Sequence, residues 1–138
     1  MAITVRRPVS ITHIVTEPLK QRLLDELRQT ADAVDTRVQQ IDFQTKRYIA
    51  EVQKSDVKRA MAIKEQVQTE LRRHEALRSD LQERIEEIEA LQVDDEYEHG
   101  QVESEVTVKE GDSITDVLGP AAIIVKDDVV IEFRGFQA

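Results

Sequence analysis

The sequence predicts an α+β protein, in which a long antiparallel helical hairpin (a coiled coil) stands on a small, mostly antiparallel β domain formed by the N- and C-terminal segments. Three observations predict this class. β-branched residues recur at alternate positions near both ends of the chain. Between them, roughly 75 residues contain neither Pro nor Gly. The apolar residues of this middle stretch follow two heptad registers that are out of phase with each other.

Residues 1–16 are expected to supply the N-terminal strand or strands of the β domain. Alternation of β-branched side chains marks residues 3–6 and 9–15 as extended. Pro8 lies between them and has no N–H to donate to a ladder, so it predicts either a break or a sheet edge. Thr16 follows as a candidate N-cap, because the period then changes from two to 3.6.

Residues 17–93 are expected to form the hairpin. Their first seam comprises Leu27, Ala31, Val34, Val38, Ile41, Thr45, Tyr48 and Val52. Their second seam starts at Ala60 or Ile63 and continues through Val67, Leu71, His74, Leu77 or Arg78, Leu81, Ile85 and Ile88. The phase change between the two seams places a turn near residues 53–57.

Two structures explain such a phase change: a stutter in one continuous helix, or a reversal of the chain. A continuous rod would hold the terminal strands roughly 110 Å apart, at 1.5 Å per residue. Reversal gives arms of nearly equal length, 18–54 and 56–92, and lets both ends of the chain join one sheet. No Gly or Pro marks the turn. We predict the hairpin, with Ser55 as N-cap and Asp56 in the first turn of the second helix.

Residues 94–100 are expected to form an acidic linker, and residues 101–138 the C-terminal part of the β domain. Alternating valines predict a half-buried strand over 101–109. Ser113 and Asp116 have capping-box spacing for a short helical turn that Gly119 ends. A final β-hairpin is expected around a loop of odd length, Lys126–Asp128. That loop would keep five apolar side chains on one face: Ile123, Val125, Val129, Ile131 and Phe133.

The order of these elements resembles that of a known family. A β-branched start runs into "TEPLKQRLLDEL", a charged helical stretch follows, and the chain closes on "GPAAIIVKDDVVIEFRG". This layout is similar to the YlqD family, a family of small bacterial proteins of unknown function with no assigned catalytic residues. The resemblance covers nearly the whole chain and implies a bacterial cytoplasmic origin and this order of elements. It implies no catalytic or binding residue.

Composition argues against several classes of function. There is no cysteine, no Gly-rich phosphate loop and no run of about 18 apolar residues. The histidines His13, His74 and His99 fall in different zones of the chain. We therefore expect a cytoplasmic protein that is not an enzyme, has no cofactor or metal site and does not enter a membrane. The net charge of −9 is concentrated in residues 94–138, which hold 12 acidic and 3 basic side chains.

A basic cluster at the expected tip of the hairpin is the main candidate site. Residues 46–64 hold six basic side chains against two acidic ones, a net charge of +4. The basic residues are Lys46, Arg47, Lys54, Lys58, Arg59 and Lys64. The ordinary explanation for them is the charged face that any long exposed helix carries. The functional explanation is that the tip, about 55 Å from the base of the hairpin, docks on a negatively charged partner.

Three functions are compatible with this layout. The first is a structural or protein-interaction module that binds another protein or forms a homo-oligomer, because four apolar residues fall off the main seam and could contact a partner. These residues are Phe43, Ile49, Met61 and Ile63. The second is a ribosome- or RNA-associated factor that docks through the basic tip. The third is a prefoldin-like holdase, by analogy of architecture alone.

Overall fold

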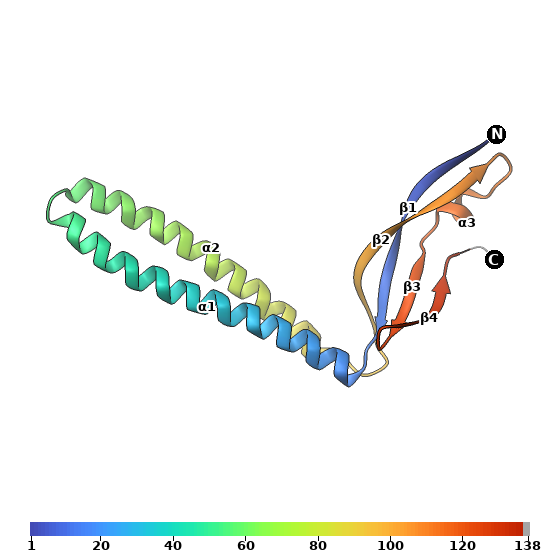
Figure 1. Cartoon of the computed structure of the whole chain (residues 1–138), viewed down its shortest axis with the longest axis horizontal. Helices are drawn as coiled ribbons and strands as arrows, with labels where there is room; N and C mark the ends of the chain where they lie inside the picture. The colour runs from blue at the N-terminus through green and yellow to red at the C-terminus, as the bar shows by residue number, and fades with distance from the viewer. Residues whose placement is uncertain (137–138) are drawn as a thin grey trace. The chain divides into compact units, whose positions relative to one another are not determined.

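The computed structural model describes residues 1–136 and confirms the α+β class (Figure 1). The chain runs through strand β1 (Ala2–Ile14), helices α1 (Glu17–Gln53) and α2 (Val57–Ala90), strand β2 (Glu96–Lys109), helix α3 (Ile114–Leu118) and strands β3 (Ala122–Lys126) and β4 (Val129–Arg134). These elements form two compact units. The sheet unit comprises Met1–Lys20 and the chain from Leu91 onward, and the hairpin unit comprises Gln21–Ala90.

The chain reverses between α1 and α2, as the phase change of the two seams predicted. Within residues 1–136, only Asp94, Asp127 and Asp128 are non-glycine residues with a positive φ, so the turn needs no left-handed residue. The backbone N–H groups of Ser55 and Asp56 both donate to the carbonyl oxygen of Val52, at 3.1 and 2.8 Å. This arrangement explains how the turn forms without Gly or Pro.

The N-cap of α2 is Asp56, one residue later than predicted. An oxygen of the Asp56 carboxylate accepts a hydrogen bond from the backbone N–H of Arg59 at 3.1 Å, which is the bond that an N-cap makes to the third helical residue. The Ser55 hydroxyl instead donates back to the Val52 carbonyl at 3.3 Å. The prediction was wrong because two adjacent residues both had capping side chains, and the length of the turn decided between them.

At the other end of the hairpin, Thr16 caps α1 as expected. The oxygen of its hydroxyl accepts a hydrogen bond from the backbone N–H of Leu19 at 3.4 Å. The same hydroxyl donates a hydrogen bond to the carboxylate of Asp127 at 2.7 Å. The second bond ties the start of α1 to the turn between β3 and β4. Lys20 donates to the carbonyl oxygen of Leu91 at 2.8 Å, which holds the chain entering the hairpin beside the chain leaving it.

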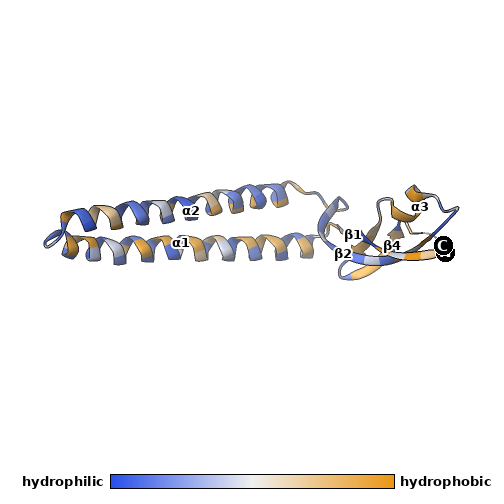
Figure 2. Cartoon of the chain, turned by 90° about the horizontal axis from the view of Figure 1, so that it is seen from above, coloured by the Kyte–Doolittle hydropathy of each residue, from blue (hydrophilic) through white to orange (hydrophobic). Residues whose placement is uncertain are grey.

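Inside the hairpin the two predicted seams face each other, with apolar and polar residues alternating along both helices (Figure 2). Ala31, Val34 and Leu81 form a buried cluster against which Leu27 and Val38 pack. The first seam departs from prediction near the turn, where Tyr48 is exposed and its neighbour Ile49 is half-buried instead. In the second seam, Arg78 rather than Leu77 points inward.

Two ion pairs between the helices favour one antiparallel alignment. Arg78 on α2 donates to the carboxylate of Asp35 on α1 at 3.1 Å, and Arg28 on α1 lies 2.9 Å from Glu89 on α2. These groups are largely solvated, so each pair contributes little to stability but favours one alignment over its neighbours. Among the described helices, none combines the length and apolar character that crossing a membrane requires.

In the sheet unit, the strand order is β2-β1-β3-β4. β1 pairs antiparallel with β2 along its whole length and parallel with β3 over Ser10–His13 only. Of the two expectations for Pro8, the structure shows an edge and not a break. The Ser10 N–H donates toward β3, to Ala121, and amides two residues apart share one strand edge. The nitrogen of Pro8 therefore points to that same edge, where pairing with β3 has not yet begun.

Residues 94–100, expected as a linker, instead hold a tight turn and the first part of β2. Asp94 has φ 75°, and the Asp95 carboxylate accepts from the backbone N–H of Gln92 at 2.8 Å. β2 begins at Glu96 and pairs with β1 opposite Ile14. The acidic composition concealed the strand, because the outward positions of an edge strand can all be charged.

The β3–β4 hairpin is tighter than predicted. Its loop is Asp127–Asp128 alone, with φ 49° and 67°, which is the geometry of a type I′ turn. The pairing register with β4 shifts between Ile124 and Val125 of β3. Side chains at alternate positions along β4 therefore do not all lie on one face of the sheet. Ile124 is buried with Val9 and Val15 in the core of the unit, whereas every residue of β4 is exposed. The expected single apolar face was therefore wrong.

Two arginines complete the sheet unit. Arg7 is buried in β1; its guanidinium donates to the carbonyl oxygen of Val117 at 2.7 Å and lies 4.9 Å from the ring centroid of Phe136. Arg134 on β4 lies 2.7 Å from Glu96 on β2. The hydrogen bond from Arg134 lowers the pKa of the Glu96 carboxyl below its usual value. This pair links the two edge strands of the sheet.

Candidate interaction site at the hairpin tip

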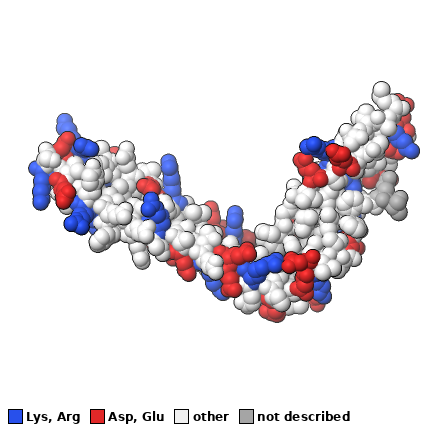
Figure 3. Space-filling view, in the orientation of Figure 1, with Lys and Arg blue, Asp and Glu red and all other residues white. Residues whose placement is uncertain are grey.

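The structure places the six predicted basic residues at the end of the hairpin where the chain reverses, which we call the hairpin tip (residues 46–64). Lys46 and Arg47 lie on α1 and Lys54 lies in the turn. Lys58, Arg59 and Lys64 lie on α2. Figure 3 shows basic side chains gathered at this end of the hairpin, with a few acidic ones between them.

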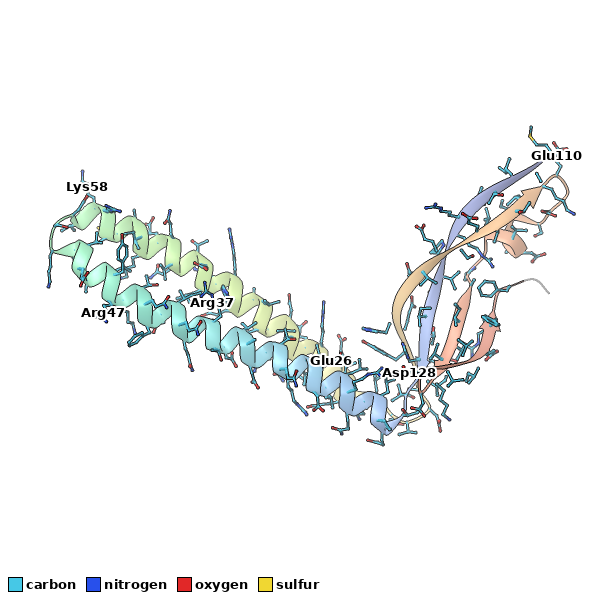
Figure 4. The ribbon with its side chains drawn as sticks, viewed as in Figure 1. Glu26, Arg37, Arg47, Lys58, Glu110 and Asp128 are labelled. Atoms are coloured by element: carbon cyan, nitrogen blue, oxygen red, sulfur yellow. The ribbon has the colours of Figure 1, made fainter. Side chains whose placement is uncertain are left out.

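The basic residues surround the tip and do not form one patch. Successive residues of an α-helix point about 100° apart, so Lys46 and Arg47, like Lys58 and Arg59, face different directions. Figure 4 shows Arg47 and Lys58 projecting from opposite sides of the hairpin. The geometry divides the predicted set in two. Lys46 and Lys64 border a groove between the helices, and the other four lie outside it.

Most of these charges are available to a partner. Lys46 makes an ion pair with Asp42 one turn earlier, with 3.1 Å between the ammonium nitrogen and the carboxylate oxygen. The other five have no ion pair with any residue in the described part of the chain. Neighbouring carboxylates therefore neutralise only part of the charge of the tip, which keeps a net charge of +4 over residues 46–64.

The groove between α1 and α2 has a volume of about 470 Å³. Its apolar lining residues are Ile49, Ala50, Val57, Ala60, Met61 and Leu71. Its polar lining residues are Asp42, Thr45, Lys46, Gln53, Lys64 and Gln68. All of them belong to the hairpin unit, so the groove is a feature of that unit alone.

The groove exists because two helices cannot cover all the apolar residues that the tip carries. Toward the base of the hairpin, Leu81, Ile85 and Ile88 are buried in α2. In the first part of α2, only Ala60 is buried, and the side chain of Met61 remains 63% exposed. In larger helix bundles, a third helix packs against a helix pair that leaves apolar residues uncovered on one side.

The sequence indicates part of this groove. Ile49 and Met61 are two of the apolar residues off the main seam, and both line it. Phe43, another residue of that set, lies outside the groove and is 74% exposed. The contributions of Gln53 and Gln68 carried no signal in the sequence, because a polar residue on a helix is expected to face solvent.

Two of the three histidines are closer together than their separation in sequence suggested, and the third, His74, lies on α2. His13 on β1 and His99 on β2 lie with ring centroids 6.1 Å apart, and Tyr97 stacks on His99 at 5.6 Å. The antiparallel pairing of β1 with β2 brings these zones of the chain side by side. Within residues 1–136, no three His, Asp or Glu side chains are grouped closely enough to hold a metal ion.

Comparison with known proteins gives one family and one fold. The sequence model of the YlqD protein family matches residues 3–134. A crystal structure of a protein of unknown function from Synechococcus sp. WH 8102 superposes with a TM-score of 0.82 at 21% identity, covering 97% of this chain and 95% of that chain. That likeness shows a shared fold. No curated protein matches the sequence. The family match spans nearly all of the chain, which confirms the resemblance seen in the order of its elements: the chain belongs to the YlqD family.

Proposed function

We propose that the protein is a non-enzymatic interaction module, which binds an acidic protein partner through its hairpin tip. The observation that supports this proposal is the combination at the tip of unpaired cations with an apolar groove. Cations steer and orient an acidic partner, and burial of apolar surface supplies most of the binding free energy.

The groove favours a protein over RNA as the partner. A nucleic acid held by the tip would contact Lys and Arg through its phosphates, and the apolar side chains of Ile49 and Met61 would remain in water. A protein segment can cover these side chains and also place carboxylates beside the lysines. An RNA- or ribosome-associated role is the second outcome of the experiment below.

A first experiment compares two probes of similar negative charge: a fluorescein-labelled acidic peptide containing leucines, and a labelled single-stranded RNA. Anisotropy titrations across a salt series measure the affinity of the full chain for each. The acidic peptide is expected to bind more tightly, and its affinity should fall as salt rises. Replacing Lys54 and Lys58 by Glu changes the local charge by four units and should weaken peptide binding at least about tenfold at low salt.

The matched control carries the same charge change elsewhere on the hairpin. Arg37→Glu with Arg84→Glu alters two exposed arginines outside the groove and should change peptide affinity by no more than about twofold. Tighter binding of RNA than of peptide contradicts the proposal and favours the ribosomal role. Equal binding of a neutral leucine-containing peptide favours a holdase instead.

We also propose that the chain self-associates through β4. This strand is one of two edges of the sheet, all of its residues are exposed, and its Glu132 and Arg134 balance in charge. The other edge, β2, carries several glutamates and would repel a second copy of itself. A second copy of the chain is therefore the occupant that suits β4.

A further inference from the structure

The two walls of the tip groove are stripes of helical spacing. On α1 the lining residues recur at intervals of three and four from Asp42 to Gln53, and on α2 they do so from Val57 to Leu71. Such stripes are what a helix presents to a neighbouring helix in a bundle. The shape of the groove therefore matches a rod laid parallel to α1 and α2, and matches an extended strand or a globular surface less well.

The length of the stripes sets the length of the occupant. The α1 wall covers 12 residues from Asp42 to Gln53, which is about 17 Å at 1.5 Å per residue. A helix of about 12 to 14 residues, three to four turns, spans that distance. Apolar residues of the occupant at helical spacing would face Ile49, Met61 and Leu71, which line the groove.

Charge selects the kind of helix. Lys64 borders the groove from α2 with no ion pair to any described residue, and Lys46 borders it from α1, where it is paired with Asp42 of the same wall. Carboxylates on both flanks of the occupant would lie near these lysines. A second copy of the tip is a poor occupant, because two segments of net charge +4 would repel each other.

We propose that the groove binds an acidic amphipathic α-helix of a partner protein, which packs between α1 and α2 as the third helix of a short bundle. The inference rests on the proposed function and specifies its partner: three to four turns, an apolar stripe facing the groove, and acidic residues on both flanks. Helices of this kind bind other proteins by the same helix-in-groove mode.

The test uses two labelled peptides of about 14 residues and identical composition, both rich in Glu with a few leucines. In one, the leucines follow helical spacing; in the other, the order is scrambled so that no apolar stripe forms. The full chain should bind the first peptide at least about tenfold more tightly than the second. Circular dichroism should show added helix on binding the first peptide, because a free peptide of this length is mostly unfolded.

Two variants of matched chemistry locate the binding site. Met61→Glu places a carboxylate in the lining of the groove, at a side chain 63% exposed, and should lower affinity for the amphipathic peptide at least about tenfold. Phe43→Glu introduces the same group at a side chain 74% exposed outside the groove and should leave affinity within about twofold. Replacing Lys46 and Lys64 by Glu should transfer preference to a peptide with Lys in place of Glu.

The outcomes separate this inference from the proposed function. If both acidic peptides bind equally, with no gain of helix and no effect of Met61→Glu, the tip binds acidic protein without recognising a helix, and the inference is wrong. If neither peptide binds while RNA does, the proposed function itself is contradicted. Binding that Phe43→Glu abolishes and Met61→Glu does not would place the partner on another face of the hairpin.

Discussion

Asp56 is the residue on which the start of α2 depends. Its carboxylate accepts the backbone N–H of Arg59 at 3.1 Å, and the negative charge also lies at the positive end of the helix dipole. Ser55, immediately before it, bonds back to the end of α1 instead. Adjacent residues of similar capping propensity thus serve two different helices.

The residue-scale prediction compares these neighbours. Asp56→Ala should lower the free energy of unfolding of the hairpin by about 1 kcal/mol, because an N–H at the helix start loses its acceptor. Ser55→Ala should lower it by less than about 0.5 kcal/mol, since its hydroxyl is exposed and water can replace it. Urea denaturation followed by circular dichroism measures both. A larger effect at Ser55 than at Asp56 would assign the cap to the serine after all.

At the scale of elements, the hairpin depends on which side of α2 faces α1. The second seam passes through Leu81, 5% exposed, and bypasses Leu77, 47% exposed. Arg78 takes the inward position between them, where it reaches Asp35 on α1. A polar residue at a seam position specifies how the two helices align, but it makes the helix pair less stable than an apolar residue would.

The element-scale prediction uses the two leucines as a matched pair. Leu81→Ala removes buried methyl groups from the cluster with Ala31 and Val34 and should destabilise the hairpin by about 2–5 kcal/mol. Leu77→Ala makes the same change in helix propensity at an exposed position. It should lower the free energy of unfolding by less than about 1 kcal/mol. Chemical denaturation gives both values. Equal losses would mean that the seam runs along the other face of α2.

At the scale of the whole molecule, the two proposed interaction surfaces differ in their charge. The tip is basic and carries the groove, whereas residues 94–138 have 12 acidic and 3 basic side chains, a net charge of −9. Within that acidic part, β4 is an exposed apolar strand with balanced charge. Distinct partners are therefore expected for each: an acidic protein at the tip, and a second copy of the chain at β4.

The whole-molecule prediction concerns oligomeric state. Size-exclusion chromatography with light scattering should find the wild-type chain as a dimer or larger, and Ile131→Glu on β4 should convert it to a monomer. Ile3→Glu on β1 is the control, because Ile3 and Ile131 are both isoleucines in strands of the same sheet and are both 55% exposed. A monomeric wild type, or equal disruption by both variants, would contradict self-association through β4.

The helical hairpin can be predicted from the sequence alone. Heptad spacing, the absence of Pro and Gly, and the equality of the two arms are local properties, and helix formation depends mainly on residues three and four apart. For the same reason the cap at Thr16 and the presence of a basic tip could be read directly from the chain. The YlqD resemblance rested on the same order of elements.

Which surfaces remain exposed depends on how the elements pack in three dimensions. The position of β3 beside β1 in the sheet depends on the pairing of segments more than 100 residues apart. The tip groove likewise depends on how two seams meet across the hairpin, which neither seam encodes alone. Such features arise from the competition of distant segments for the same partner, and no local period in a sequence records the result of that competition.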